Sequence, residues 1–151
     1  MTPAQLTALK SEIQTDPAAL GYAAYLPDAP GRVCALLNAI STTMTRSRFI
    51  TARTILAECG MDGPAILDTL DAVAANVSAV KWAMRFLQQD SGIDIGHPAT
   101  QAMLNQLRAA GALQVSQVDA LKALAVQAAS RAQVLGFETV AETDLHAAGA
   151  V

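Results

Sequence analysis

The chain has 151 residues, enough for one domain that buries roughly 70% of the surface of its unfolded state. Hydrophobic residues make up 52% and charged residues only 15%, against about 25% charged residues in an average domain. The formal net charge of -3 excludes a general attraction to nucleic acid, and each apolar run is shorter than the ~18–20 residues of a membrane span. We therefore expect a soluble helical protein that hides part of its surface against other subunits, or else a monomer simply rich in alanine.

The chain begins with a predicted helix over about residues 2–15. Thr2 and Gln5 have the spacing of a capping box, and apolar residues then recur at intervals of three and four. Asp16-Pro17 ends this helix, because the residue before a proline is pushed out of the helical region. The same periodicity predicts a second helix over about residues 27–40.

The segment 44–54 is β-branched and basic, and its sequence fits a loop, a short hairpin or the start of another helix. No acidic residue occurs within positions 29–57, whereas Arg46, Arg48 and Arg53 all fall there. Mixed with Ser and Thr, these arginines are candidates for contact with phosphates or with the acidic rim of a partner. The alternative is an ordinary solvated basic loop.

Helical periodicity returns after this segment and predicts helices over about 62–77 and 78–89. In the second of them, Trp82 and Phe86 lie on a different side from the main apolar face. A helix with apolar groups on two faces is central in the fold, or is sandwiched between the core and a partner.

Two more helices are predicted, one ending near Gly111 and the longest one over about 116–135. Gly136 is expected to end the longest helix in the left-handed conformation, and residues 137–151 are expected to form a short C-terminal tail. No repeat or linker divides the sequence. The fold class is therefore predicted as mostly all-α, a single domain over 1–151 built as a compact bundle of about six helices.

Residues with the chemistry of an active site are scarce. His97 lies in a Gly-His-Pro turn and His146 near the end of the chain, and neither lies beside a nucleophile in a known motif. Asp68 and Asp71 share a helix face, but their positions alternate with the apolar face, so they are expected to point to water. Cys34 and Cys59 lack metal or redox spacing and are expected to be buried free thiols in a reducing cytosol. We expect no enzyme activity, no metal and no cofactor.

Two sets of motifs carry a resemblance to known proteins. Near the start are Leu9-Lys10-Ser11-Glu12-Ile13, then Asp16-Pro17, Gly21-Tyr22 and Leu36-Leu37-Asn38; near the end are Ser130-Arg131-Ala132 and Leu135-Gly136. In this order they resemble the small structural proteins of tailed bacteriophages and prophages, of the neck or head-to-tail connector type. Residues 41–112 lie outside the resemblance.

The resemblance implies a non-enzymatic virion component, made in the cytoplasm of the bacterial host. The position it favours is the neck, as an adaptor or head-completion subunit in a homo-oligomeric ring between portal and tail. The implied partners are the portal and neighbouring neck or tail proteins, with non-specific contact to packaged DNA and no membrane. Two alternatives stay open: another virion post, such as head decoration or a tail-associated protein, and a soluble partner-binding adaptor that never enters particles. Within the motifs, the structural residues are Asp16, Pro17, Gly21, Tyr22, Arg131 and Gly136.

Overall fold

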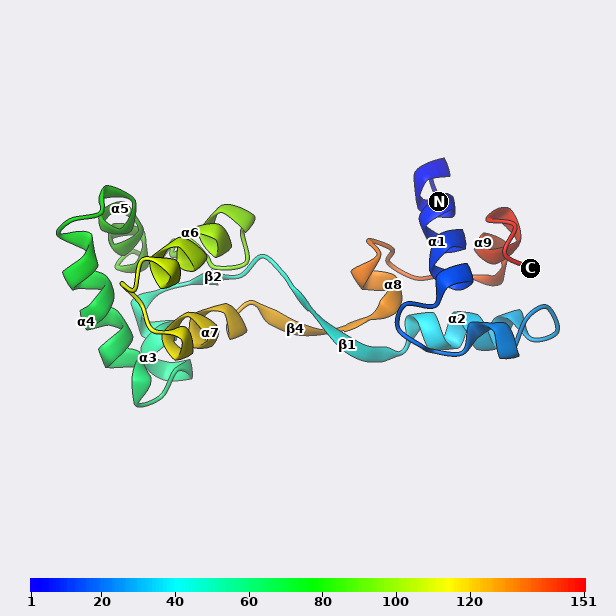
Figure 1. The fold of residues 1–151 in the computed structure, drawn as a ribbon, viewed down its shortest axis with the longest axis horizontal. Coiled ribbons are helices and arrows are strands. Elements are labelled where there is room, and N and C mark those ends of the chain that lie inside the picture. Colours follow the sequence, from blue (N-terminus) through cyan, green and yellow to red (C-terminus); the bar gives the residue numbers. More distant parts are fainter. The chain divides into compact units, whose positions relative to one another are not determined.

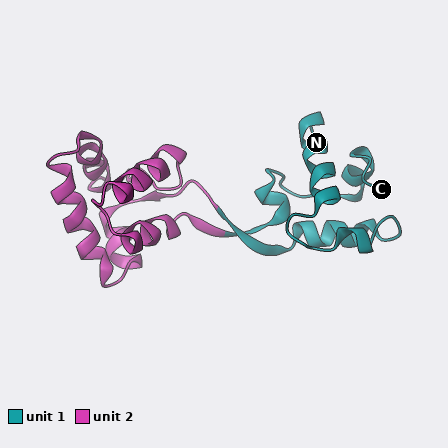
Figure 2. Ribbon diagram, viewed as in Figure 1, with its two compact units in different colours: residues 1–44, 128–151 teal, residues 45–127 magenta.

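The computed structural model describes residues 1–151 and divides them into two compact units. Unit 1 consists of residues 1–44 and 128–151, and unit 2 of residues 45–127 (Figure 2). The sequence predicts a single domain, because hydrophobic periodicity shows which residues are buried but not which of them pack together. Here the two ends of the chain share one core, and the middle of the chain forms another.

The chain is mostly helical, as predicted, but it has nine α-helices rather than about six (Figure 1). Most of the additional ones are short. In chain order the elements are α1 (Pro3–Thr15), the 3-10 turn η1 (Tyr22–Ala24), α2 (Pro30–Asn38), β1 (Ile40–Thr45), β2 (Phe49–Ile50), α3 (Ala52–Glu58), α4 (Asp62–Ala74), α5 (Ser78–Leu87), β3 (Ile93–Asp94), α6 (Pro98–Ala109), α7 (Val115–Ala123), β4 (Val126–Ser130), α8 (Arg131–Val134) and α9 (Glu142–Ala147).

Unit 1 is built from helices at both ends of the chain. The predicted capping box of α1 is present: the Thr2 hydroxyl accepts from the backbone of Gln5, and the Gln5 side chain accepts from the backbone of Thr2. α2 packs against α8 and α9, and α1 packs against α9. The buried hydrophobic residues of this unit are Leu9, Ile13, Tyr22, Val33, Cys34, Leu37, Ala132, Phe137, Val140, Leu145 and Ala148.

Residues 137–151 are part of this core and not a tail. Phe137, Val140 and Leu145 are buried. The side-chain amide of Asn38 donates to the Val140 carbonyl at 2.8 Å and its oxygen accepts from the Val140 amide at 2.9 Å. The prediction of a tail fails because these apolar residues are too sparse to show a period, although they are needed to close a core between the chain ends.

Unit 2 contains α3 to α7. α4 packs against α3 and α5, and α6 packs against α7. The unit also contains the antiparallel strand pair β2–β3, in which Phe49 lies opposite Asp94 and Ile50 opposite Ile93. Its core holds the buried residues Ile50, Ile55, Ile66, Leu70, Val80, Met84, Leu87, Ile95, Leu104, Leu107, Leu113, Val118, Leu121, Leu124 and Ala125.

Two local predictions are corrected. Of the three alternatives for segment 44–54, the hairpin is wrong, because β2 pairs with β3 while β1 pairs with β4. The segment does lead into another helix, α3, as one of the alternatives expected. The predicted helix over 116–135 is three elements: α7, β4 and α8. Its alanines favour a helix, and the strand forms against this preference because β4 pairs with β1. The Ser130 hydroxyl accepts from the Gln133 backbone amide at 3.2 Å and so caps the start of α8. A new helix therefore begins inside the range predicted as one helix.

Candidate functional site

The motif residues of unit 1 form an internal polar cluster around Glu12, which is only 4% exposed. Arg131 donates to both carboxylate oxygens of Glu12, from Nε at 2.6 Å and from Nη2 at 2.7 Å. The fully buried Tyr22 donates its hydroxyl to Glu12 Oε1 at 3.3 Å. A bidentate pair of this kind fixes orientation as well as charge, so it holds α1, η1 and α8 in one arrangement.

The remaining motif residues shape turns in unit 1. The Asp16 carboxylate accepts from the backbone amides of Leu20 at 2.8 Å and Gly21 at 2.7 Å. Gly21 has a φ of +78° and Gly136 a φ of +81°, which glycine adopts without strain. Gly136 thus follows a helix in the left-handed conformation, as predicted, although that helix is the short α8. Pro17 is exposed next to the turn.

The predicted basic segment of unit 2 is largely engaged within the unit. Arg48 donates from Nη1 to the Leu124 carbonyl at 2.7 Å and forms an ion pair with Glu58. The backbone amide of Arg46 donates to the Ala125 carbonyl at 2.9 Å, and its Nε is buried without a partner. Of the three arginines in this segment, only Arg53 has an exposed side chain without an ion pair. The structure therefore does not bring the three arginines together as one open patch.

Asp94 holds the backbone of this segment in place. Its carboxylate accepts from the Ser47 hydroxyl at 2.6 Å and from the backbone amides of Arg48 and Gly96, each at 2.9 Å. The Ser47 hydroxyl, with those two amides, lowers the pKa of Asp94. A Cβ at Gly96 would collide with the Arg46 carbonyl, so this position requires a glycine.

An open apolar groove of unit 2 lies between α5 and α6. On α5, Val80, Met84 and Leu87 face the core, while Trp82 is 56% and Phe86 is 48% exposed. Behind these two rings is a groove of about 260 Å³. We call it the aromatic groove; it is lined by Ala79, Trp82, Ala83, Phe86, Ile93, Ala99, Thr100 and Met103. The predicted second apolar face of this helix is thus open to solvent.

The two helices beside the aromatic groove carry only basic charges. α5 carries Lys81 and Arg85, α6 carries Arg108, and neither helix contains an acidic residue. The guanidinium carbon of Arg85 lies 4.4 Å from the centroid of the Trp82 ring, the geometry of a cation–π contact. This stacking places a positive charge on the Trp82 ring at the mouth of the groove. The combination favours an apolar ligand with negative charge beside it.

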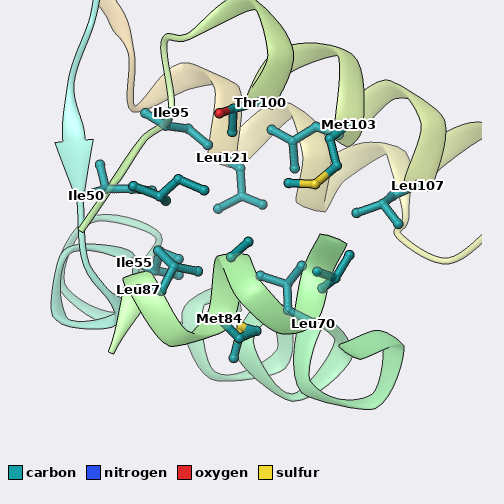
Figure 3. Close-up of a pocket in the computed structure, with 14 residues that line it drawn as sticks. Ile50, Ile55, Leu70, Met84, Leu87, Ile95, Thr100, Met103, Leu107 and Leu121 are labelled. Atoms are coloured by element: carbon teal, nitrogen blue, oxygen red, sulfur yellow. The ribbon is translucent and has the colours of Figure 1, made fainter. Parts of the chain in front are cut away.

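A second cavity lies in the core of unit 2, where Ile50, Leu121 and Met103 surround it (Figure 3). Its volume is about 30 Å³. Thr100 supplies its only polar side chain, whereas a buried water needs about two to four polar partners. Ala83, Ile93, Thr100 and Met103 line both this cavity and the aromatic groove, so the floor of the groove lies over a loosely packed part of the core.

The other candidate residues are dispersed. His97 caps α6, where its ring nitrogen Nδ1 accepts from the Ala99 amide at 3.2 Å, and His146 is exposed in unit 1. Asp68 and Asp71 are exposed on α4, as predicted. No group of three or more His, Cys, Asp or Glu side chains is placed to hold a metal ion.

Both cysteines are free thiols. Cys34 is buried in unit 1 and Cys59 is half-buried in unit 2. Burial raises the pKa of each thiol, and the acidic neighbours Glu142 and Glu58 respectively raise it further. A raised pKa keeps a thiol protonated and unreactive at neutral pH, so neither has the environment of a nucleophile.

Comparison with known proteins adds no family: no family model, no curated protein and no solved structure matches this chain. None of its helices combines the length and the apolar character that crossing a membrane requires.

Proposed function

We propose that this chain is a non-enzymatic structural subunit of a tailed-bacteriophage virion that assembles with other subunits through the aromatic groove of unit 2. Its position in the particle is the neck, as an adaptor or head-completion subunit in a ring between portal and tail. The choice of the virion and the neck rests on the sequence motifs of unit 1. The choice of assembly as the activity rests on the groove.

The observation that carries the proposal is the exposure of Trp82 and Phe86 beside one groove. Isolated apolar residues are normal on a protein surface, but clustered aromatic ones with a polar rim mark interaction sites. The volume of about 260 Å³ lies below the roughly 300–1,000 Å³ of small-molecule pockets. The only polar side chain in the lining is the Thr100 hydroxyl, and the lining contains no base that could activate it. The groove is therefore suited to protein side chains.

Arg53 has a secondary part in this proposal. It is the member of the basic segment that is free to contact packaged DNA or the portal, since Arg48 is paired and the Nε of Arg46 is buried. One exposed arginine supports a weak, sequence-independent contact, whose contribution falls with salt.

Mass spectrometry of purified virions tests the proposal. Tailed particles from the host that carries this gene should contain the chain at a constant ratio to the portal protein. Repeated failure to find the chain in intact particles contradicts a virion role. In that case, capture of a non-virion partner whose binding is lost in a Trp82→Ala variant would favour the soluble adaptor.

A further inference from the structure

We propose that the occupant of the aromatic groove is a second copy of this chain, which inserts Met61, at the corner between α3 and α4, into the groove of its neighbour. The inference rests on the proposed function, because it names the contact through which the subunits of a ring associate. We define the Met61 corner as residues 56–62.

The Met61 corner presents an apolar knob to solvent. Met61 is 98% exposed and Leu56 is 47% exposed. No other large hydrophobic residue of the chain is as exposed as Met61. A flexible thioether side chain fills irregular gaps and interacts favourably with aromatic rings, which is what the mouth of the groove offers.

The corner is held rigidly, so binding through Met61 costs little ordering of the backbone. Gly63 is buried, and a Cβ there would lie 2.8 Å from the Ile55 carbonyl oxygen and 3.0 Å from the Leu56 Cα. This close approach fixes α4 against α3. The amides of Asp62 and Gly63 donate to the carbonyls of Cys59 and Gly60, each at 3.2 Å. A preorganised knob loses less conformational entropy on binding than a mobile loop.

The knob and the groove have opposite charges beside them. Asp62 adjoins Met61, and Glu58 lies one turn before, although Glu58 already pairs with Arg48. Beside the groove, Arg85 stacks on the Trp82 ring, and neither α5 nor α6 contains an acidic residue. Complementary charges of this kind set the register of a contact and raise its association rate. Two Met61 corners facing each other would instead bring two Asp62 carboxylates together without a cation from the groove.

The contact is heterologous, since the two surfaces share no residue. Within unit 2, α3 lies at the lower edge and α5 and α6 at the upper edge in Figure 1. Each copy thus donates one knob and accepts another, which generates a ring if the rotation closes and a filament if it does not.

Single-stranded nucleic acid is the other occupant that exposed aromatic rings beside lysine and arginine admit. The charge of unit 2 disfavours it: seven Lys and Arg residues (46, 48, 53, 81, 85, 108 and 122) oppose seven Asp and Glu residues (58, 62, 68, 71, 90, 94 and 119), a net charge of zero. Nucleic acid also leaves the exposure of Met61 without an explanation. The second copy accounts for both surfaces.

Sedimentation velocity of the full-length chain over a range of concentrations tests the contact. The wild type should associate as its concentration rises. Met61→Asp and Phe86→Asp should each weaken association at least about tenfold. Val115→Asp is the matched control, since Val115 is a 58% exposed residue of unit 2 outside both surfaces, and it should behave as wild type. Circular dichroism checks that each variant is folded.

Mixing the two variants provides the decisive arm. Met61→Asp keeps its groove and Phe86→Asp keeps its knob, so an equimolar mixture should form dimers and no larger species. The contact is wrong if Met61→Asp associates as strongly as the wild type, or if the mixture stays monomeric. The subunit would then assemble through another surface. A wild type that is monomeric at every concentration overturns both the contact and the ring. Binding of an oligothymidine that is lost in Phe86→Asp, without self-association, assigns the groove to nucleic acid and overturns the inference.

Discussion

Unit 1 and unit 2 are stabilised in different ways and present different surfaces. Unit 1 has a buried ion pair at its centre and a net charge of -3, from three basic residues (10, 32 and 131) and six acidic ones (12, 16, 28, 138, 142 and 144). Unit 2 has a larger, apolar core, no net charge and the aromatic groove. The most recognisable sequence motifs thus lie inside unit 1, whereas the surface suited to binding lies in unit 2.

The residues that make the sequence recognisable are therefore different from the residues of the proposed binding surface. Motifs such as Asp16-Pro17 and Gly21-Tyr22 are recognisable because a turn and a buried hydrogen-bond network permit few substitutes. A docking surface needs only apolar shape and complementary charge, which many sequences supply. The four predictions below test this division, since the single tryptophan lies in unit 2 and both tyrosines lie in unit 1.

The largest effect is expected from removing the cation of the buried pair. Arg131→Met leaves the Glu12 carboxylate, whose side chain is 3% exposed, without its partner. Removing one member of a buried ion pair costs about 3–5 kcal/mol. Hydrogen exchange should show loss of protection in α1 and α9 of unit 1. The unfolding of unit 2, followed by Trp82 fluorescence, should be the same as in the wild type. The control Arg32→Met, at an exposed position, should change stability by less than about 0.5 kcal/mol. Equal loss of protection in both units would contradict two separate cores.

The corresponding change in unit 2 is the loss of an apolar core side chain. Leu121 is 2% exposed and lines the small core cavity. Leu121→Ala enlarges that cavity and should destabilise unit 2 by about 2–5 kcal/mol. The urea midpoint reported by Trp82 should fall, whereas exchange protection of α1 should stay. If the midpoint reported by Trp82 stayed the same and α1 lost its protection, the assignment of Leu121 to the core of unit 2 would be wrong.

A smaller effect, with a pH signature, is expected at Tyr22. Burial, followed by the charge of Glu12, raises the pKa of its phenol well above the usual value. Because the folded pKa is the higher one, this contribution to stability is complete below pH of about 10 and is lost as the pH rises further. Tyr22→Phe should cost about 1 kcal/mol at neutral pH and remove this alkaline loss. Urea unfolding followed by circular dichroism, at neutral pH and above pH of about 10, measures both effects. If the variant lost as much stability at alkaline pH as the wild type, Tyr22 would not be the cause of that loss.

The smallest effect is expected at Asp94 in unit 2, at the opposite end of the pH scale. Its lowered pKa contributes stability above the unfolded value of about 4, and that contribution is lost as the pH falls through the folded value. Asp94→Asn should therefore flatten the acid dependence of the Trp82 unfolding midpoint. Asp90→Asn, at an exposed position, is the control. The same slope in wild type and Asp94→Asn would contradict the role of this carboxylate.

Local signals in the sequence predict local structure well. The Thr2–Gln5 capping box, the stop at Asp16 and the left-handed Gly136 are each found where the pattern puts them. The two apolar faces of the Trp82 helix are predicted too, since they depend only on spacing within one helix. These features depend on neighbours a few residues away, which a single sequence displays.

What the sequence does not predict depends on distant partners. In the sequence, Glu12 looks like an exposed acid on an amphipathic helix. In the structure it is paired with Arg131 of α8, which lies 119 residues away in the sequence. The strands β1 and β4 are paired across the chain, so their alanine and threonine residues show no turn between them. The Met61 corner is not predictable from the sequence either. The run Gly60-Met61-Asp62-Gly63 indicates a turn, and only the structure shows that the Met61 side chain is 98% exposed.

The fluorescence of Trp82 on assembly tests the central claim, that the aromatic groove is the surface covered between subunits, most directly. Trp82 is the only tryptophan and is 56% exposed in the single chain, so its emission in the folded protein reports the surroundings of this groove. As the concentration rises and sedimentation shows association, the emission should move to shorter wavelength and quenching by acrylamide should fall, in wild type but not in Met61→Asp. Association with unchanged Trp82 emission and quenching would contradict the account.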